Sequence, residues 1–188
     1  MARKMIQINP EKWLDNYGDY LYNYARFKLP SKEVAEDVVQ ETFLSAFTSY
    51  EKFKGNSSEK TWLVTILKRR IVDYYRKAAR NQEKNMSSFK LPFQEQGDFQ
   101  NHWMEQRAPK NWEVDDKIQL DEFHQVLQYC LSLLSPKHRL VFMMKVLDEC
   151  SSEQVCKDVE IKPSNLWTIM HRARLQIREC VEKKWLSI

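Results

Sequence analysis

The sequence predicts an all-α fold, with two small helical domains joined by a flexible linker. First, only three of the 188 residues are glycine, which argues against a turn-rich β fold and against glycine-rich phosphate loops. Second, apolar residues recur at helical spacing in two blocks, at about residues 10–84 and 116–185. Third, the intervening stretch keeps no period and holds two of the six prolines. We therefore expect domains over residues 1–85 and 116–188, with a linker over 86–115.

The charge is unevenly distributed along the chain. The net charge is +4, yet residues 68–80 alone hold six Lys or Arg and a single Asp. A local concentration of basic charge is what a phosphate backbone attracts. The linker is acidic by comparison and unusually aromatic, so we expect it to pack on these domains or on a partner; its large rings are Phe89, Phe93, Trp103 and Trp112.

Several function classes are disfavoured by the composition. The four cysteines (130, 150, 156 and 180) form no CxxC pair, and with the histidines they lack zinc-site spacing. We expect unpaired thiols and no metal or cofactor. No apolar run approaches the ~18 residues of a membrane span, and the first residues lack an apolar stretch of signal-peptide length. We therefore expect a soluble, cytoplasmic protein with no membrane insertion of its own.

The first well-marked helix is predicted to begin at Ser31, a plausible N-cap, and to run to Tyr50. One face of this helix is apolar and comprises Val34, Val38, Val39, Thr42 and Ala46. The opposite face carries a row of polar side chains around one leucine, namely Asp37, Gln40, Glu41 and Leu44. This row is either a solvated polar face, as most such rows are, or a docking stripe for a basic partner surface.

A loop and a basic helix follow. Residues 50–60 place aromatic side chains beside lysines on a flexible segment, which could stack on an unpaired base or close the preceding helix against the core. Residues 61–80 form a basic amphipathic helix. Its expected apolar face comprises Trp62, Leu63, Ile66, Leu67 and Tyr74, and its expected outer line comprises Thr65, Arg69, Val72 and Arg76. Acidic protein, nucleic acid and, least favoured, a membrane surface could bind such a helix.

The second block predicts a helix-turn-helix. A helix over 116–134 is followed by a second that begins at Ser135-Pro136, where a cap precedes a proline. A two-turn helix then begins near Ser151, the turn Glu-Ile-Lys follows, and Pro163 begins the last helix. A short helix, a three-residue turn and a longer helix are typical of DNA-binding proteins, although a plain helical hairpin has the same pattern.

The last helix divides into an inner and an outer face. Leu166, Ile169, Met170, Ala173 and Ile177 are expected to pack inward. The outer face is expected to carry Ser164, Thr168, His171, Arg172 and Leu175, with Trp167 at the boundary. Small polar and basic side chains near a helix N-terminus suit a DNA major groove.

Three segments together resemble the extracytoplasmic-function (ECF) sigma factors of bacterial RNA polymerase. AEDVVQETFLSAF (35–47) is similar to their polymerase-docking helix. Residues 53–77, from FKG to DYYRK, resemble the segment that melts and reads the −10 element, and 131–180 resembles the domain that reads the −35 element. The resemblance implies a sigma-two helical bundle over 1–85, a sigma-four helix-turn-helix over 116–188, and no catalysis.

The resemblance also implies a role for each set of residues. Core polymerase, at the clamp helices of its largest subunit, would be bound by Asp37, Gln40, Glu41 and Leu44. The −10 element would be bound by Phe53, Lys54, Asn56, Lys60, Trp62, Arg69, Arg76 and Lys77. The −35 element would be bound by Lys162, Ser164, Asn165, Thr168, His171, Arg172 and Arg174. Further expected partners are promoter DNA, the polymerase flap and an anti-sigma factor, the last suggested by the REC motif and Trp185.

The sequence departs from the family pattern at several positions. Glu160 stands where the turn often has glycine, Trp167 and Ile169 stand at positions that are often basic, and Arg69 replaces a common Asn. Three other functions were weighed: a helix-turn-helix regulator that acts without polymerase, a helical hydrolase, and an adaptor held by another protein. The regulator leaves the stripe at Asp37, Gln40 and Glu41 without a purpose, and the scattered histidines give a hydrolase no catalytic cluster.

Overall fold

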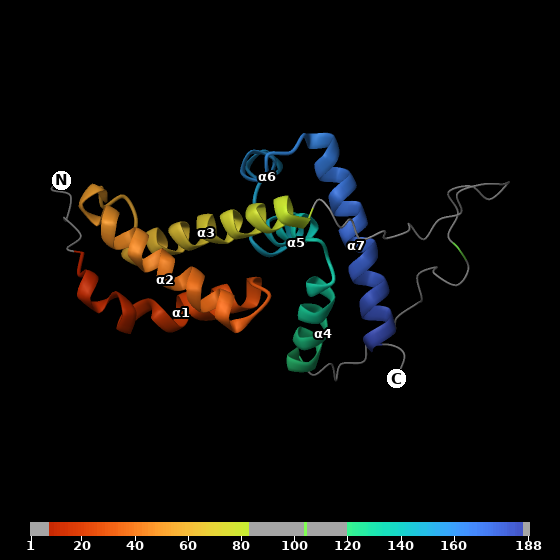
Figure 1. The fold of residues 1–188 in the computed structure, drawn as a ribbon, viewed down its shortest axis with the longest axis horizontal. Helices are drawn as coiled ribbons and strands as arrows, with labels where there is room; N and C mark the ends of the chain where they lie inside the picture. Colours follow the sequence, from red (N-terminus) through yellow and green to blue (C-terminus); the bar gives the residue numbers. More distant parts are fainter. Residues whose placement is uncertain (1–7, 83–103, 105–119, 186–188) are drawn as a thin grey trace. The chain divides into compact units, whose positions relative to one another are not determined.

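The computed structural model describes residues 8–82, 104 and 120–185, and all regular structure in these ranges is helical (Figure 1). The chain divides into two compact units, the first ending at Lys77 and the second beginning at Ala78. The predicted all-α fold with two helical domains is therefore confirmed. The predicted linker lies outside the described residues except for Met104, as does the expected helical start at 116–119.

The first unit contains two long helices, all but the last five residues of a third, and two short turns of 3-10 helix. They are η1 (Pro10–Lys12), α1 (Trp13–Lys28), α2 (Lys32–Ser49), η2 (Tyr50–Lys52) and α3 (Glu59–Gln82). Figure 1 shows α1 and α2 side by side, and these two helices are in contact. Ser31 caps α2 as predicted, because its hydroxyl accepts a hydrogen bond from the Val34 amide at 3.3 Å.

The core of the first unit follows the helical period closely. On α2 the predicted inner residues Val38, Val39, Thr42 and Ala46 are buried, whereas Val34, also predicted to lie inside, is only half-buried. The Thr42 hydroxyl donates to the Val38 carbonyl at 2.7 Å, so its burial leaves no unpaired donor.

On α3 the buried stripe is narrower than predicted. It runs at four-residue steps and comprises Leu63, Leu67, Ile71 and Tyr75. The predicted inner residues Trp62, Ile66 and Tyr74 are only half-buried, because they flank this stripe. Tyr75, which the prediction omitted, donates its hydroxyl to the Lys28 carbonyl at 2.6 Å and so joins α3 to the end of α1.

The second unit is organised around a central helical segment. Its elements are α4 (Leu120–Ser132), α5 (Pro136–Phe142), the π-helical turn η4 (Met143–Leu147), α6 (Ser152–Val159) and α7 (Pro163–Trp185). All six residues from Arg139 to Met144 are buried. A helix buried on all sides lies at the centre of its domain. Around it, α7 contacts α4, α5 and α6.

The helix-turn-helix is present as predicted. Ser151 caps α6 by accepting from the Gln154 amide at 3.1 Å, and the turn ends where α7 begins at Pro163. Glu160 ends α6 with φ 57° and ψ 49°, the left-handed conformation that glycine adopts most easily. The turn therefore has the backbone geometry of a glycine turn, although the residue is a glutamate.

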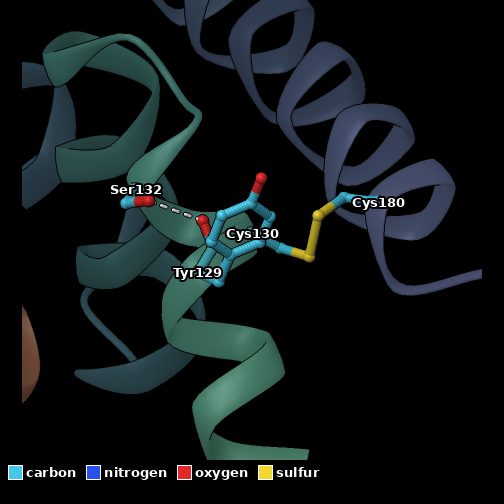
Figure 2. The surroundings of a disulfide bond; sticks show 4 residues. All are labelled: Tyr129, Cys130, Ser132 and Cys180. Carbon is cyan, nitrogen blue, oxygen red and sulfur yellow. Dashed lines mark hydrogen bonds between the residues drawn. A yellow bond between two sulfur atoms is a disulfide. The ribbon is translucent and has the colours of Figure 1, made fainter. Parts of the chain in front are cut away.

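The prediction of four unpaired thiols was wrong. Cys130 of α4 and Cys180 of α7 form a disulfide, with their Cα atoms 5.7 Å apart (Figure 2). Cys150 and Cys156 take no part in a disulfide. Sequence spacing did not reveal the pair because the two cysteines are 50 residues apart and meet only through the packing of α4 on α7.

The left-handed residue gives a first prediction. Glu160→Gly should be more stable than Glu160→Ala by about 1 kcal/mol, because only the alanine retains a Cβ in that conformation. Urea denaturation of the two variants measures the difference, and both lose the glutamate side chain equally. At the exposed Lys157 of α6 the sign should reverse, with alanine favoured over glycine. Equal stabilities at position 160 would contradict the turn geometry.

Candidate functional site

The predicted docking residues form one exposed row on α2. Asp37, Gln40, Glu41 and Leu44 are all exposed, and Leu44 retains 66% of its surface. We call these four residues the α2 stripe. Phe47, three residues beyond Leu44, is 61% exposed and was missed by the sequence analysis. Its spacing from Leu44 was the signal, since residues three apart share a helix face.

A basic side chain from α3 lies against the α2 stripe. A guanidinium nitrogen of Arg70 is 4.0 Å from a carboxylate oxygen of Glu41, and another donates to the Ser45 hydroxyl. Both members of the ion pair are largely exposed, so the pair contributes less than about 1 kcal/mol to stability. Arg70 therefore leaves the negative charge of the stripe available to a partner.

The predicted −10 loop rests on a cluster of aromatic rings. Phe53 and Trp62 have ring centroids 5.0 Å apart, and Trp62 contacts Trp13 edge-on at 5.8 Å. Trp13 also contacts Tyr50. Phe53 and Trp62 are half-buried, whereas Trp13 is only 2% exposed. The cluster anchors both ends of the loop and keeps part of two rings accessible.

Within the loop, the polar side chains point outward. Lys54 and Asn56 are exposed, and Gly55 between them has φ +68° with open space where a Cβ would lie. The Lys60 ammonium lies 3.6 Å from the centroid of the Tyr20 ring, which fixes it at the start of α3. The turn therefore presents Lys54 and Asn56 to solvent, with aromatic contacts on both sides of it.

Glu59 joins this loop to the beginning of the chain, and the sequence analysis missed it. Its carboxylate accepts three hydrogen bonds, from the Asn9 amide at 2.9 Å, the Trp13 indole at 3.1 Å and the Tyr17 hydroxyl at 3.1 Å. Burial, and next the hydrogen bond to Glu59, raises the pKa of Tyr17 above its ordinary value. No short-range motif could identify Glu59, since its partners lie 42 to 50 residues away.

The basic helix α3 exposes a different line of residues from the one predicted. Arg69 and Lys77 are exposed, as expected, but Arg76 is half-buried with a guanidinium nitrogen 4.0 Å from a carboxylate oxygen of Asp73. Val72, which was placed on the outer line, is also half-buried. The exposed line runs at four-residue steps opposite the buried stripe, through Thr65, Arg69, Asp73 and Lys77.

The predicted −35 residues all lie on the surface of the helix-turn-helix. Exposed side chains occur at each of the seven positions, Lys162, Ser164, Asn165, Thr168, His171, Arg172 and Arg174. The inner face is also as predicted, with Leu166, Ile169, Met170, Ala173 and Ile177 buried. Trp167 is 72% exposed and therefore belongs to the outer face.

Leu175 is a correction to the predicted outer face. It is 7% exposed, although helical phase places it opposite the inner residues. A single-face argument fails for this part of α7 because the helix contacts three others. On α5, which packs against α7, His138 is half-buried. Burial, and next the positive charge of Arg172, lowers the pKa of His138, so this imidazole is neutral at pH 7.

Two kinds of site were not found in the described ranges. No group of three or more His, Cys, Asp or Glu side chains there could hold a metal ion. Among the helices of those same residues, none is long and apolar enough to cross a membrane.

Two protein-family models match this chain, one in each unit. Residues 13–81 match Sigma-70 region 2, and residues 124–177 match Sigma-70 region 4. The first match covers α1 to α3, and the second covers the helix-turn-helix. These two units define a sigma factor of the sigma-70 class. Sigma factors are non-catalytic transcription initiation factors.

Relatives with the same two-domain extent narrow the class. A probable RNA polymerase sigma factor of Haemophilus influenzae is 36% identical over 172 residues, which cover 87% of this chain and 85% of that protein. The ECF RNA polymerase sigma factors SigX and SigW of Bacillus subtilis are 26% and 25% identical, over 89% and 88% of this chain and 81% and 85% of theirs. The chain belongs to the ECF sigma factors, and it is an RNA polymerase-associated, promoter-recognising protein.

A solved structure is also similar to this chain. It is a co-crystal structure of the sigma factor RpoE with the anti-sigma factor NepR from Bartonella quintana, with a TM-score of 0.49 and 20% identity. The alignment covers 93% of this chain and 97% of that one.

The Glu59 anchor gives a second prediction. Glu59→Ala should destabilise the first unit by about 2 kcal/mol, because the buried Trp13 indole loses its acceptor. The pKa of Tyr17 should fall toward its ordinary value of 10.0, so that the tyrosinate forms at lower pH. Urea denaturation and an NMR titration of labelled tyrosine measure the two effects. Glu51→Ala, at an exposed carboxylate of η2, should change neither quantity.

Proposed function

We propose that this ECF sigma factor binds core polymerase through the α2 stripe, opens the −10 element with the loop before α3, and reads the −35 element with α7. The observation that best supports these three roles is that every residue of the α2 stripe and of the −35 set is exposed. Apart from Lys162 in the turn before α7, these residues lie on helices whose other faces form the cores of their own units.

The α2 stripe suits a basic polymerase surface. Two carboxylates and an amide surround the exposed Leu44, so a partner can pair charges at the edge and bury an apolar side chain at the centre. We assign this contact to the clamp helices of the largest polymerase subunit. The sigma-four unit would contact the polymerase flap. The linker over 86–115, between domains over 1–85 and 116–188, would pass near the active cleft.

The −10 element would be captured by stacking and held by charge. Unstacking one base costs a few kcal/mol, which stacking against an aromatic ring can offset. The accessible parts of Phe53 and Trp62 supply the ring surface, Lys54 and Asn56 are exposed in the same loop, and Lys60 is exposed at the start of α3. Arg69, Arg76 and Lys77 would hold the phosphate backbone along α3.

The −35 element would be read by the N-terminal half of α7. Ser164, Asn165 and Thr168 offer short hydrogen-bonding groups to base edges, and Arg172 can contact a guanine with two donors. Lys162 and Arg174 carry charge at the two ends of this face and would contact phosphate.

The remaining assignments follow from this role. We propose that the chain catalyses no reaction, uses no cofactor and works in the cytoplasm, where it would meet RNA polymerase and promoter DNA. An anti-sigma factor is a further proposed partner. The structural relative that was crystallised with the anti-sigma factor NepR makes such a partner a natural one to seek.

The docking assignment is tested by charge removal on α2. Asp37→Ala combined with Glu41→Ala should weaken binding to core polymerase at least tenfold, because the basic groups of the polymerase surface lose both carboxylates with which they pair. Fluorescence anisotropy with purified core measures the affinity. The matched control, Asp15→Ala with Asp19→Ala, removes two exposed carboxylates from α1 and should bind normally. Equal affinities for both double variants would exclude the α2 stripe.

The −35 assignment is tested by comparing two basic residues. Arg172→Ala should weaken binding to the preferred −35 sequence by about 1–3 kcal/mol and relax the preference at one base pair. Lys162→Ala should weaken binding to all sequences alike and reduce the salt dependence by about one phosphate contact. Binding to a randomised −35 library at several salt concentrations separates the two. A uniform loss for Arg172→Ala would reassign that residue to phosphate.

A further inference from the structure

We propose that the Cys130–Cys180 disulfide is a reversible modification site, at which a dithiol reductant opens the bond and loosens the hold of α4 on α7. The proposal rests on the proposed function where it concerns −35 DNA, because α7 is the helix assigned to read that element. Its chemical part stands on the cysteines alone.

Because of its position, the disulfide affects the stability of the whole second unit. It joins α4 to α7 across 50 residues of sequence, and Figure 2 shows it bridging the two helices. The closed loop contains α5, η4, α6 and most of α7. A cross-link across a loop of this length restricts the unfolded chain and so stabilises the folded unit.

The bond is accessible from one side. Cys130 is 1% exposed, whereas Cys180 is partly exposed and lines an open surface pocket. The pocket is also lined by Tyr129, Leu133, Gln176, Glu179, Lys183 and Lys184. An incoming thiolate can therefore reach Cys180 while Cys130 stays covered.

The charges around the pocket favour such an attack. The Lys184 ammonium lies 4.9 Å from the centroid of the Tyr129 ring, and the Lys183 ammonium pairs with Glu179 at 3.2 Å. Both lysines line the same pocket as Cys180, and positive charge near a disulfide attracts an attacking thiolate. Tyr129 and Leu133, which are 47% and 55% exposed, give the pocket an apolar rim against which a reductant protein can pack.

The exchange balances with a dithiol of the thioredoxin class as reductant. Its thiolate attacks the Cys180 sulfur, the bond to Cys130 breaks, and Cys130 leaves as a thiolate that takes up a proton. The second thiol of the reductant then attacks the mixed disulfide and releases Cys180. Two electrons and two protons pass to the protein, and the dithiol becomes a disulfide. Oxidised glutathione reverses the reaction through the same mixed-disulfide step.

The setting also points to reversibility. A sigma factor works with RNA polymerase, and in a compartment kept reduced by dithiols, disulfides are usually transient and redox-sensing. Cys150 and Cys156 are also partly exposed but take no part in a disulfide, so the oxidised pair is specific to the contact between α4 and α7.

The test follows the full chain through glutathione buffers of graded reduced-to-oxidised ratio. At each ratio, alkylation and mass spectrometry give the fraction of each cysteine that is reduced. Calorimetry gives the Tm of the second unit, and a −35 duplex selected from a random library gives the DNA affinity. We expect Cys130 and Cys180 to titrate together and reversibly. On reduction the Tm should fall by about 15 °C, and DNA affinity should fall at least fivefold.

Two variants keep this test decisive. The Tm of Cys130→Ser should equal that of the reduced wild type and should not change with the glutathione ratio. If this variant fails to fold, the chemically reduced wild type supplies the same measurement. Cys150→Ser with Cys156→Ser should titrate as the wild type does. A bond that stays closed in every reducing buffer would overturn the proposal, as would reduction with no change in Tm. Failure of the oxidised wild type to select any DNA sequence would instead overturn the −35 assignment.

Discussion

Each long helix of this protein has one face that packs into a core and another that is exposed for binding. The described residues contain no strand, so each helix satisfies its own backbone and is free to use its sides for different purposes. On α2 the division is clean, with Val38 and Thr42 buried and Asp37 and Glu41 exposed. The function of the molecule depends on this separation, since a polymerase-binding or DNA-binding face must not be needed to hold the unit together.

Much of this division could be predicted from periodicity. The seven −35 positions and the α2 stripe were assigned from helical phase and family resemblance, and their exposure agrees with that phase. Local chemistry was equally informative at Ser31 and Ser151, where a hydroxyl precedes a helical period and accepts the expected backbone hydrogen bond. Patterns within a few residues of each other are read reliably because their physical causes are equally local.

The failures have a common physical origin in long-range packing. Glu59 accepts its three hydrogen bonds from a segment at least 42 residues away in sequence. Cys130 forms a disulfide with Cys180 only because α4 packs on α7. Leu175 is buried although its own helix places it outside. On α3 the sequence correctly indicated a basic amphipathic helix, but the predicted apolar face was too broad. Large apolar residues that are half-buried cannot be told from buried ones by sequence alone. No single-helix argument contains the neighbours that decide these cases.

The completely buried stretch from Arg139 to Met144 has a consequence for how this protein can diverge. Because buried residues hold the centre of the second unit, and the exposed residues of α7 hold little of that centre, the two sets can change independently. Under the −35 assignment proposed above, a gene duplicate could acquire a new promoter preference by substitutions at Ser164, Thr168 or Arg172 while inheriting an intact domain. Such an arrangement favours families with many members that share one architecture and address different sets of genes.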